Sequence, residues 1–271
     1  MATPGDQWAG YFYPETYNEV TQQGTLRNRL GERDPDVLAA KEYARTHERQ
    51  RELLSGEVEI PRTFDAAHVK AIHEHVFQDV YEWAGQYRTV PIFKGAIGGF
   101  ADVKGGQIDR YLSDVHRLVE ATPWERLGRD DFGERAATVF AYLNQAHPFR
   151  EGNGRTSKVF MEHVAERSSF TLNYDRVTPE QWNDASKWSG PDLLDYEPHP
   201  GTLVPVFRTI AVDRDPATQA AAEPASRAPR AVRASFPTSA ADALRQGPSS
   251  TPQARRTGPT TPDRSYGTGR D

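Results

Sequence analysis

Residues 147–155, HPFREGNGR, carry the densest set of chemically useful groups in this chain. His147 can accept a proton near neutral pH, because the pKa of an imidazole is ordinarily about 6.5. Glu151 supplies a hard oxygen ligand of the kind that Mg²⁺ takes beside phosphates. Arg155 supplies a forked guanidinium that matches phosphate oxygens. These residue types at this spacing indicate a site that holds a metal-bound polyphosphate and deprotonates a nucleophile beside it.

The same stretch lies where one predicted helix ends and the next begins. A glycine-rich turn that leads into a helix N-terminus points unpaired backbone N–H groups outward, and the helix dipole adds positive charge. Gly152 and Gly154 let the backbone approach a phosphate closely, since neither has a Cβ. Asn153 can donate its side-chain amide to a phosphate oxygen. Taken singly these residues also suit an ordinary turn, with Phe149 as a core anchor, but their combination favours chemistry.

Helices are expected to position this stretch from both sides. They are predicted from capping residues and from apolar residues that recur at helical spacing. The break before residue 147 follows from Pro148, because a residue that precedes proline resists the helical conformation. The predicted helices span about residues 34–54, 65–80, 108–119 and 131–146, and two more begin near Gly154 and after Thr178.

Residues 88–100 interrupt the helical pattern with a short β-prone run and several glycines. Such a run predicts a small β-hairpin in an otherwise helical body. Pro91 favours an edge position, and an exposed edge can pair with an extended segment of another protein. A plain connecting loop accounts for the same residues equally well.

Composition narrows the classes of protein to consider. The 271 residues include no cysteine, which excludes disulfides, thiolate metal sites and cysteine nucleophiles. No secretory signal or membrane span is evident, so we expect a cytoplasmic protein without a membrane partner. The net charge is −5 although the C-terminal region is basic, so the remaining body is acidic. An acidic body argues against direct binding of nucleic acid.

Three regions are expected along the chain. Residues 1–30 form an N-terminal extension, and residues 31–213 form one folded helical domain. Residues 214–271 are rich in Ala, Pro, Ser, Thr, Gly and Arg and contain few large apolar residues. Such a segment cannot bury enough surface to offset its ordering entropy, so we expect a disordered tail.

The order of residues 147–155 resembles the signature of the Fic family, HPFx(D/E)GNGRxxR. The resemblance extends from about residue 30 to 207, over the body and not the tail. It implies an all-α Fic fold, a helical bundle in which residues 88–100 form a β-hairpin flap that aligns a target segment by strand pairing. Further similarity lies at Ile72-His73, Phe77, 79–81, 83–85, Arg88, 94–95 and 100–101, and the flap residues that would dock the target are Thr89, Val90, Ile92, Lys94 and Gly95.

The resemblance also implies protein adenylylation, in which AMP passes from Mg-ATP to a hydroxyl side chain of a target protein. His147 would be the general base, and Glu151 would hold Mg²⁺. Arg155 would contact the outer phosphates. Lys158 stands where the family has a second arginine, and because lysine lacks the fork we expect weaker positioning of the nucleotide. The anion hole would consist of Gly152, Asn153 and Gly154.

The resemblance to the Fic family also suggests how the protein is regulated and which other activities to consider. Fic proteins are often inhibited by a helix with the pattern (S/T)xxxE(G/N), which only Ser55 and Glu59 approach here, with Ile60 in the last position. The resemblance therefore implies a bacterial toxin restrained by a separate small antitoxin, whose target could be a type II topoisomerase subunit. Secretion as an effector is the alternative location. Rival activities are a Doc-like phosphotransferase, whose signature carries lysine in place of Gly154, and a catalytically weak nucleotide-binding scaffold.

Overall fold

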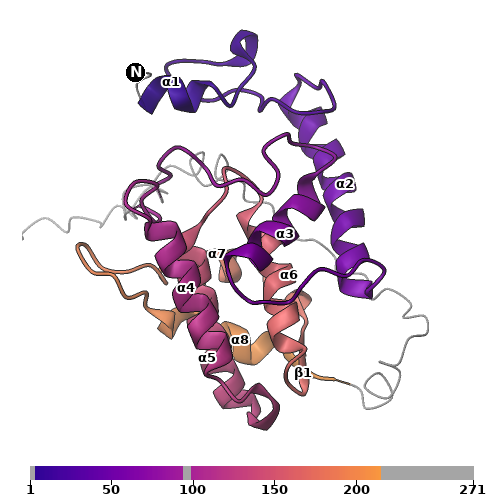
Figure 1. The fold of residues 1–271 in the computed structure, drawn as a ribbon, viewed down its shortest axis with the longest axis vertical. Coiled ribbons are helices and arrows are strands. Elements are labelled where there is room, and N and C mark those ends of the chain that lie inside the picture. Colours follow the sequence, from indigo (N-terminus) through magenta and orange to yellow (C-terminus); the bar gives the residue numbers. More distant parts are fainter. Residues whose placement is uncertain (1–3, 94–98, 215–271) are drawn as a thin grey trace, which may run out of the picture.

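The computed structural model describes residues 4–93 and 99–214 and is mostly helical, as predicted (Figure 1). From residue 215 on, the expected disordered tail lies outside the described residues. Among the helices that are described, none is long and apolar enough to cross a membrane. The helices are α1 (Pro4–Ala9), α2 (Pro35–Ser55), α3 (Ala66–Phe77), α4 (Gln107–Glu120), α5 (Arg129–Ala146), α6 (Asn153–Ala165), α7 (Pro179–Lys187) and α8 (Val204–Ile210).

Local capping explains where the helices begin. The Asp34 side chain accepts two backbone N–H groups of the first turn of α2, and Pro35 occupies the position where its missing N–H costs nothing. Asp65 caps α3 by accepting the N–H of His68 at 3.1 Å. Thr178 and Gln181 form a reciprocal capping box at the start of α7. The predicted starts of these helices are confirmed.

The core is built around α5. This helix packs against α4 and α8 and also contacts α6. Trp182 of α7 meets Phe140 of α5 edge-on, with ring centroids 4.9 Å apart. Val80, predicted on the second helix, is buried but lies beyond the end of α3, in a turn closed by its N–H to Phe77 O at 2.9 Å. The turn between α5 and α6 therefore joins two helices that the core holds rigidly.

A two-stranded antiparallel sheet was not predicted. It pairs β1 (Phe170–Leu172) with β2 (Ala211–Asp213), so that Phe170 lies opposite Asp213. Strands of three residues show no useful alternation, which is why the sequence pattern misses them.

The predicted hairpin has two arms that run side by side. Phe93 and Gly99 form an antiparallel bridge, and the Phe100 N–H donates to Ile92 O at 3.0 Å. Val90 and Ile92 are buried while Thr89 is exposed, as expected for an extended arm with alternating faces. Of the expected docking residues, Lys94 and Gly95 lie outside the described residues.

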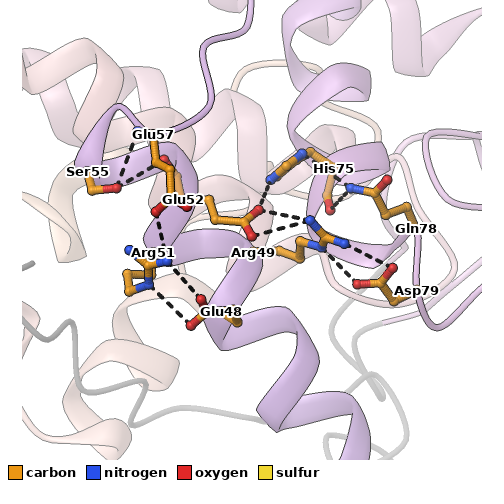
Figure 2. A network of polar contacts seen from close by, with 9 residues as sticks. All are labelled: Glu48, Arg49, Arg51, Glu52, Ser55, Glu57, His75, Gln78 and Asp79. Carbon is orange, nitrogen blue, oxygen red and sulfur yellow. Dashed lines mark hydrogen bonds and ion pairs between the residues drawn. The ribbon is translucent and has the colours of Figure 1, made fainter.

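A polar network fixes α2 against α3 and the turn after it (Figure 2). Arg49 binds Asp79 through two hydrogen bonds of 2.8 and 3.2 Å, which hold the pKa of that carboxyl below its ordinary value. Glu52 joins the network through His75 Nε2 at 2.8 Å. The network sets the position of α2, whose earlier turns reach α6.

Three buried histidines stay neutral inside the bundle. His68 accepts the Phe64 N–H on Nδ1, so its Nε2 carries the proton and donates to His163 Nδ1 at 2.9 Å. His73 accepts the Gly85 N–H on Nδ1. Burial lowers the pKa of His68 to about 4 and the pKa values of His73 and His163 to about 3.

These histidines predict instability in mild acid. The unfolded chain takes up their protons near pH 6.5, whereas the folded protein resists until about pH 4 or below, so stability falls as the pH drops through this window. For each of the three histidines, the free energy of unfolding is expected to be about 2 kcal/mol lower at pH 5 than at pH 7. Urea unfolding at both pH values measures the difference. His163→Asn makes this difference smaller, and equal stability at both pH values would contradict the prediction.

Candidate active site

The turn between α5 and α6 is closed by one side chain. Asn153 accepts the Phe149 N–H on Oδ1 at 2.9 Å and donates Nδ2 to Phe149 O at 2.8 Å. Phe149 is fully buried and stacks on His73 with ring centroids 3.7 Å apart. The amide of Asn153, expected to face a phosphate, is thus engaged within the turn in this structure. These two bonds fix the shape of the loop.

The two glycines of the turn serve different purposes. Gly152 has φ +83°, and a Cβ there would lie 2.2 Å from a carbon of the Phe77 ring, so the fold itself requires glycine. Gly154 has no left-handed backbone, is exposed, and a Cβ there would meet nothing within 4 Å. The packing of the chain does not explain glycine at position 154.

The exposed end of α6 has the backbone geometry expected of an anion site. The Thr156 N–H donates to Gly152 O at 3.0 Å, so the N–H groups of residues 153–155 precede the first possible acceptor within the helix. They lie beside the open surface at Gly154 and at the positive end of the helix dipole. The structure therefore brings the expected phosphate-binding backbone together in one place.

His147 lies on the other side of this turn. Its backbone is left-handed, with φ 38°, and its N–H donates to Leu143 O at 3.3 Å. The imidazole stacks on the Phe100 ring of the hairpin, with centroids 3.6 Å apart and planes 14° from parallel. A ring fixed in this way can receive a proton from a hydroxyl group presented along the hairpin.

Arg88 connects the hairpin to His147, a role that the sequence analysis did not identify. Its side chain is 3% exposed and donates to His147 O at 2.7 Å, Val90 O at 2.9 Å and Ala101 O at 2.5 Å. Burial lowers its pKa to about 10. Its partners are carbonyl groups of separate segments, so no local pattern reveals them. Through Arg88, both arms of the hairpin are tied to the backbone of the expected base.

Arg155 and Glu151 belong to a buried charged cluster with Glu42 of α2. Arg155 forms an ion pair with Glu42 and donates to Thr46 Oγ1 at 3.0 Å, and it lies 3.7 Å from Glu151 Oε1. Burial and the charge of Glu42 raise the pKa of Glu151. The Tyr81 hydroxyl also donates to Glu42. Arg155, expected at the outer phosphates, is held by α2 in this structure, and Glu42 is a member of the site that sequence reasoning missed.

Glu151 fits the expected magnesium ligand as a single carboxylate. Its Oε1 accepts the Gly152 N–H at 3.0 Å, beside the open end of α6. Across the two described ranges, no three side chains of His, Asp or Glu come together in a metal cluster. A metal at this position would have to take its other ligands from phosphates and water, which is how Mg²⁺ is usually bound.

Lys158 lies one helical turn beyond Gly154 and is 9% exposed. Its ammonium nitrogen is 4.9 Å from the ring centroid of Tyr174 and 5.8 Å from that of Trp182. Burial lowers its pKa to about 7, against the opposing charge of Asp175. The lysine that replaces the expected arginine is therefore packed among aromatic rings and titrates near neutral pH.

Comparison with known proteins identifies the family. The sequence model described as the Fic/DOC family matches residues 63–165, which include the whole turn and the hairpin. A Sinorhizobium fredii protein, "Probable protein adenylyltransferase y4lH", is 35% identical over 178 residues, covering 64% of this chain and 83% of that protein. The chain belongs to the Fic/DOC family.

Longer relatives and solved structures agree with this assignment. The protein adenylyltransferase VbhT of Bartonella schoenbuchensis is 36% identical over 177 residues. The chain spans about a third of the length of the first curated Fic relatives it matches. BepC of Bartonella tribocorum, solved with AMPPNP, aligns with a TM-score of 0.64 and 25% identity over 76% of this chain and 98% of that chain. A Fic domain of Bartonella quintana with bound ADP aligns with a TM-score of 0.61 and 27% identity, over 76% of this chain and 96% of that chain.

Alanine substitutions at the two glycines are expected to affect different properties, stability at Gly152 and nucleotide binding at Gly154. Gly152→Ala places a methyl group against Phe77 in a left-handed backbone, so we expect a loss of at least about 2 kcal/mol of stability. Gly154→Ala keeps the fold and its melting temperature, since its Cβ meets nothing, but weakens binding of Mg-ATP at least roughly tenfold. Thermal unfolding and calorimetric titration measure both. Unchanged affinity in a folded Gly154→Ala variant would contradict the assignment of the anion site.

Proposed function

We propose that this chain is a protein adenylyltransferase that uses ATP. The observation that carries the proposal is the exposed backbone at Gly154, where the N–H groups of α6 meet open surface at the end of the turn that begins with His147. A glycine that the fold does not need, at a helix N-terminus, suits a polyphosphate that lies against the backbone. The relatives named protein adenylyltransferase and the Fic structures with AMPPNP or ADP support ATP as the nucleotide.

The proposed reaction is a displacement at the α-phosphorus of ATP. The target hydroxyl loses its proton to His147, and its oxygen forms a bond to the α-phosphorus. The bond from that phosphorus to the oxygen bridging the α- and β-phosphates breaks, and pyrophosphate leaves. The hairpin holds the target segment, and Phe100 and Arg88 keep the imidazole and its backbone in place.

The remaining side chains would bind and orient ATP. Glu151 would hold Mg²⁺, which supplies positive charge at the phosphates when bound. Arg155 would exchange the carboxylate of Glu42 for the outer phosphates, whose anionic oxygens can accept hydrogen bonds from the same guanidinium. Lys158 would add charge on the same side of α6 mainly below its pKa of about 7.

We propose that the enzyme acts in the cytoplasm on a target such as a type II topoisomerase subunit. We propose further that a separate small antitoxin restrains it. Within the described ranges, α2 ends at Ser55, and Glu59 follows in a non-helical segment. This segment lacks the helix that an inhibitory (S/T)xxxE(G/N) pattern needs. The inhibitory glutamate would then come from a partner.

Transfer of label from ATP tests the proposed function. The full chain is incubated with Mg²⁺, cell lysate and ATP labelled at either the α- or the γ-phosphate. We expect label from the α-position on a discrete protein band, and His147→Ala should reduce its rate by roughly 10² to 10⁴.

The matched control is His116→Ala, which removes an exposed histidine of α4 far from the motif in sequence and should retain transfer. Transfer of label from the γ-position alone would contradict adenylylation and indicate a phosphotransferase. No transfer from either position, with intact ATP binding, would leave a nucleotide-binding scaffold.

A further inference from the structure

Residues 7–33, here termed the N-terminal arm, precede α2 and lie outside the region matched by the family model. The arm is folded by its own backbone. Phe12 and Leu26 form an antiparallel bridge, the Tyr13 N–H donates to Thr25 O at 3.0 Å, and the Arg27 N–H donates to Tyr11 O at 2.8 Å. Tyr11 is therefore held on an ordered support.

The arm touches the hairpin through one phenol group. Tyr11 Oη accepts the Thr89 N–H at 3.2 Å and is also 3.2 Å from Thr89 Oγ1. The ring of Tyr11 packs edge-on against Trp83, with centroids 6.2 Å apart. The arm is fastened next to this contact by the Arg29 N–H, which donates to Val80 O at 2.8 Å.

The arm also covers the catalytic motif at Arg150. This arginine is 3% exposed, and its guanidinium carbon lies 4.0 Å from the ring centroid of Trp8, 5.3 Å from Phe12 and 5.5 Å from Tyr11. Rings at these distances stabilise a cation that has few other partners. The same short arm thus contacts both the motif loop and Thr89 of the flap.

The position of Thr89 matters because of the direction of the backbone groups in the flap. Ile92 O points to the opposite arm of the hairpin, where it accepts the Phe100 N–H. Backbone groups alternate along an extended segment, so those of Pro91 and Phe93 point to the outer edge. Thr89 lies in the bend that precedes them, where its N–H is taken by Tyr11, and Pro91 has no N–H. The first N–H that can meet an incoming strand belongs to Phe93.

We propose that Tyr11 closes the outer edge of the flap at Thr89 and so sets the register in which an extended segment of the target protein pairs with it. This inference rests on the proposed protein adenylylation. Thr89 is connected to the proposed base through its neighbour Arg88, which donates to His147 O at 2.7 Å. Tyr11 is thus a positioning residue that aligns the target hydroxyl with the base.

Tyr11→Phe tests this role, because it removes the hydroxyl group and keeps the ring over Arg150. The matched control is Tyr13→Phe in the same arm, whose hydroxyl donates to Asn28 O at 3.1 Å and not to the flap. Four quantities are measured on the full chain: hydrogen exchange at the Thr89 amide, affinity for Mg-AMPPNP, the initial rate of α-label transfer to the lysate band, and the melting temperature.

We expect Tyr11→Phe to speed Thr89 exchange and to slow transfer, each by roughly threefold to tenfold. AMPPNP affinity and melting temperature stay at the wild-type values, and Tyr13→Phe changes none of the four. Wild-type transfer by Tyr11→Phe would overturn the proposal, as would equal losses in both variants together with a lower melting temperature.

The proposed function can fail separately. If the wild-type chain labels nothing, adenylylation is rejected, and the proposal that Tyr11 aligns a target falls with it. The Thr89 exchange rate then still decides the contact itself: faster exchange in Tyr11→Phe alone retains the closed flap edge, and unchanged exchange rejects it.

Discussion

The site depends on the double hydrogen bond between the Asn153 amide and the backbone of Phe149. It closes a loop that leaves α5 through a left-handed His147 and enters α6 through a left-handed Gly152. Such backbone conformations persist only where the surroundings determine them. Here the ring of Phe77 fits against Gly152. If this loop opened, the N-terminus of α6 and the backbone of His147 would no longer be held at a fixed separation.

Two buried arginines then connect the loop to the rest of the fold, and they are stabilised in different ways. Arg88 is surrounded by carbonyl oxygens, which satisfy its donors without a countercharge. Arg155 is paired with Glu42, and removal of that partner would leave a buried charge uncompensated. The first arginine orders the hairpin beside His147. The second is bound to an anionic partner, and in the proposed reaction it would exchange this carboxylate for phosphate oxygens.

Local signals in the sequence predicted what local interactions determine. Asp34 and Thr178 cap their own helices, so their positions alone revealed the helix starts. The contacts that complete the site are long-range and leave no local pattern. Arg155 meets Glu42 across 113 residues, and Tyr11 meets Thr89 across 78. Asn153 shows a further limit of sequence reasoning. Its residue type indicated the turn correctly, but not that its side chain bonds to the backbone of Phe149 in this structure.

The central claim is that the backbone at the start of α6 binds the phosphates of ATP. It is tested most directly by following the backbone amide resonances during titration with Mg-AMPPNP. The account predicts that the amides of Asn153, Gly154 and Arg155 show the largest shifts in the chain and saturate together. Saturable binding of the nucleotide that leaves these three amides unchanged would contradict it.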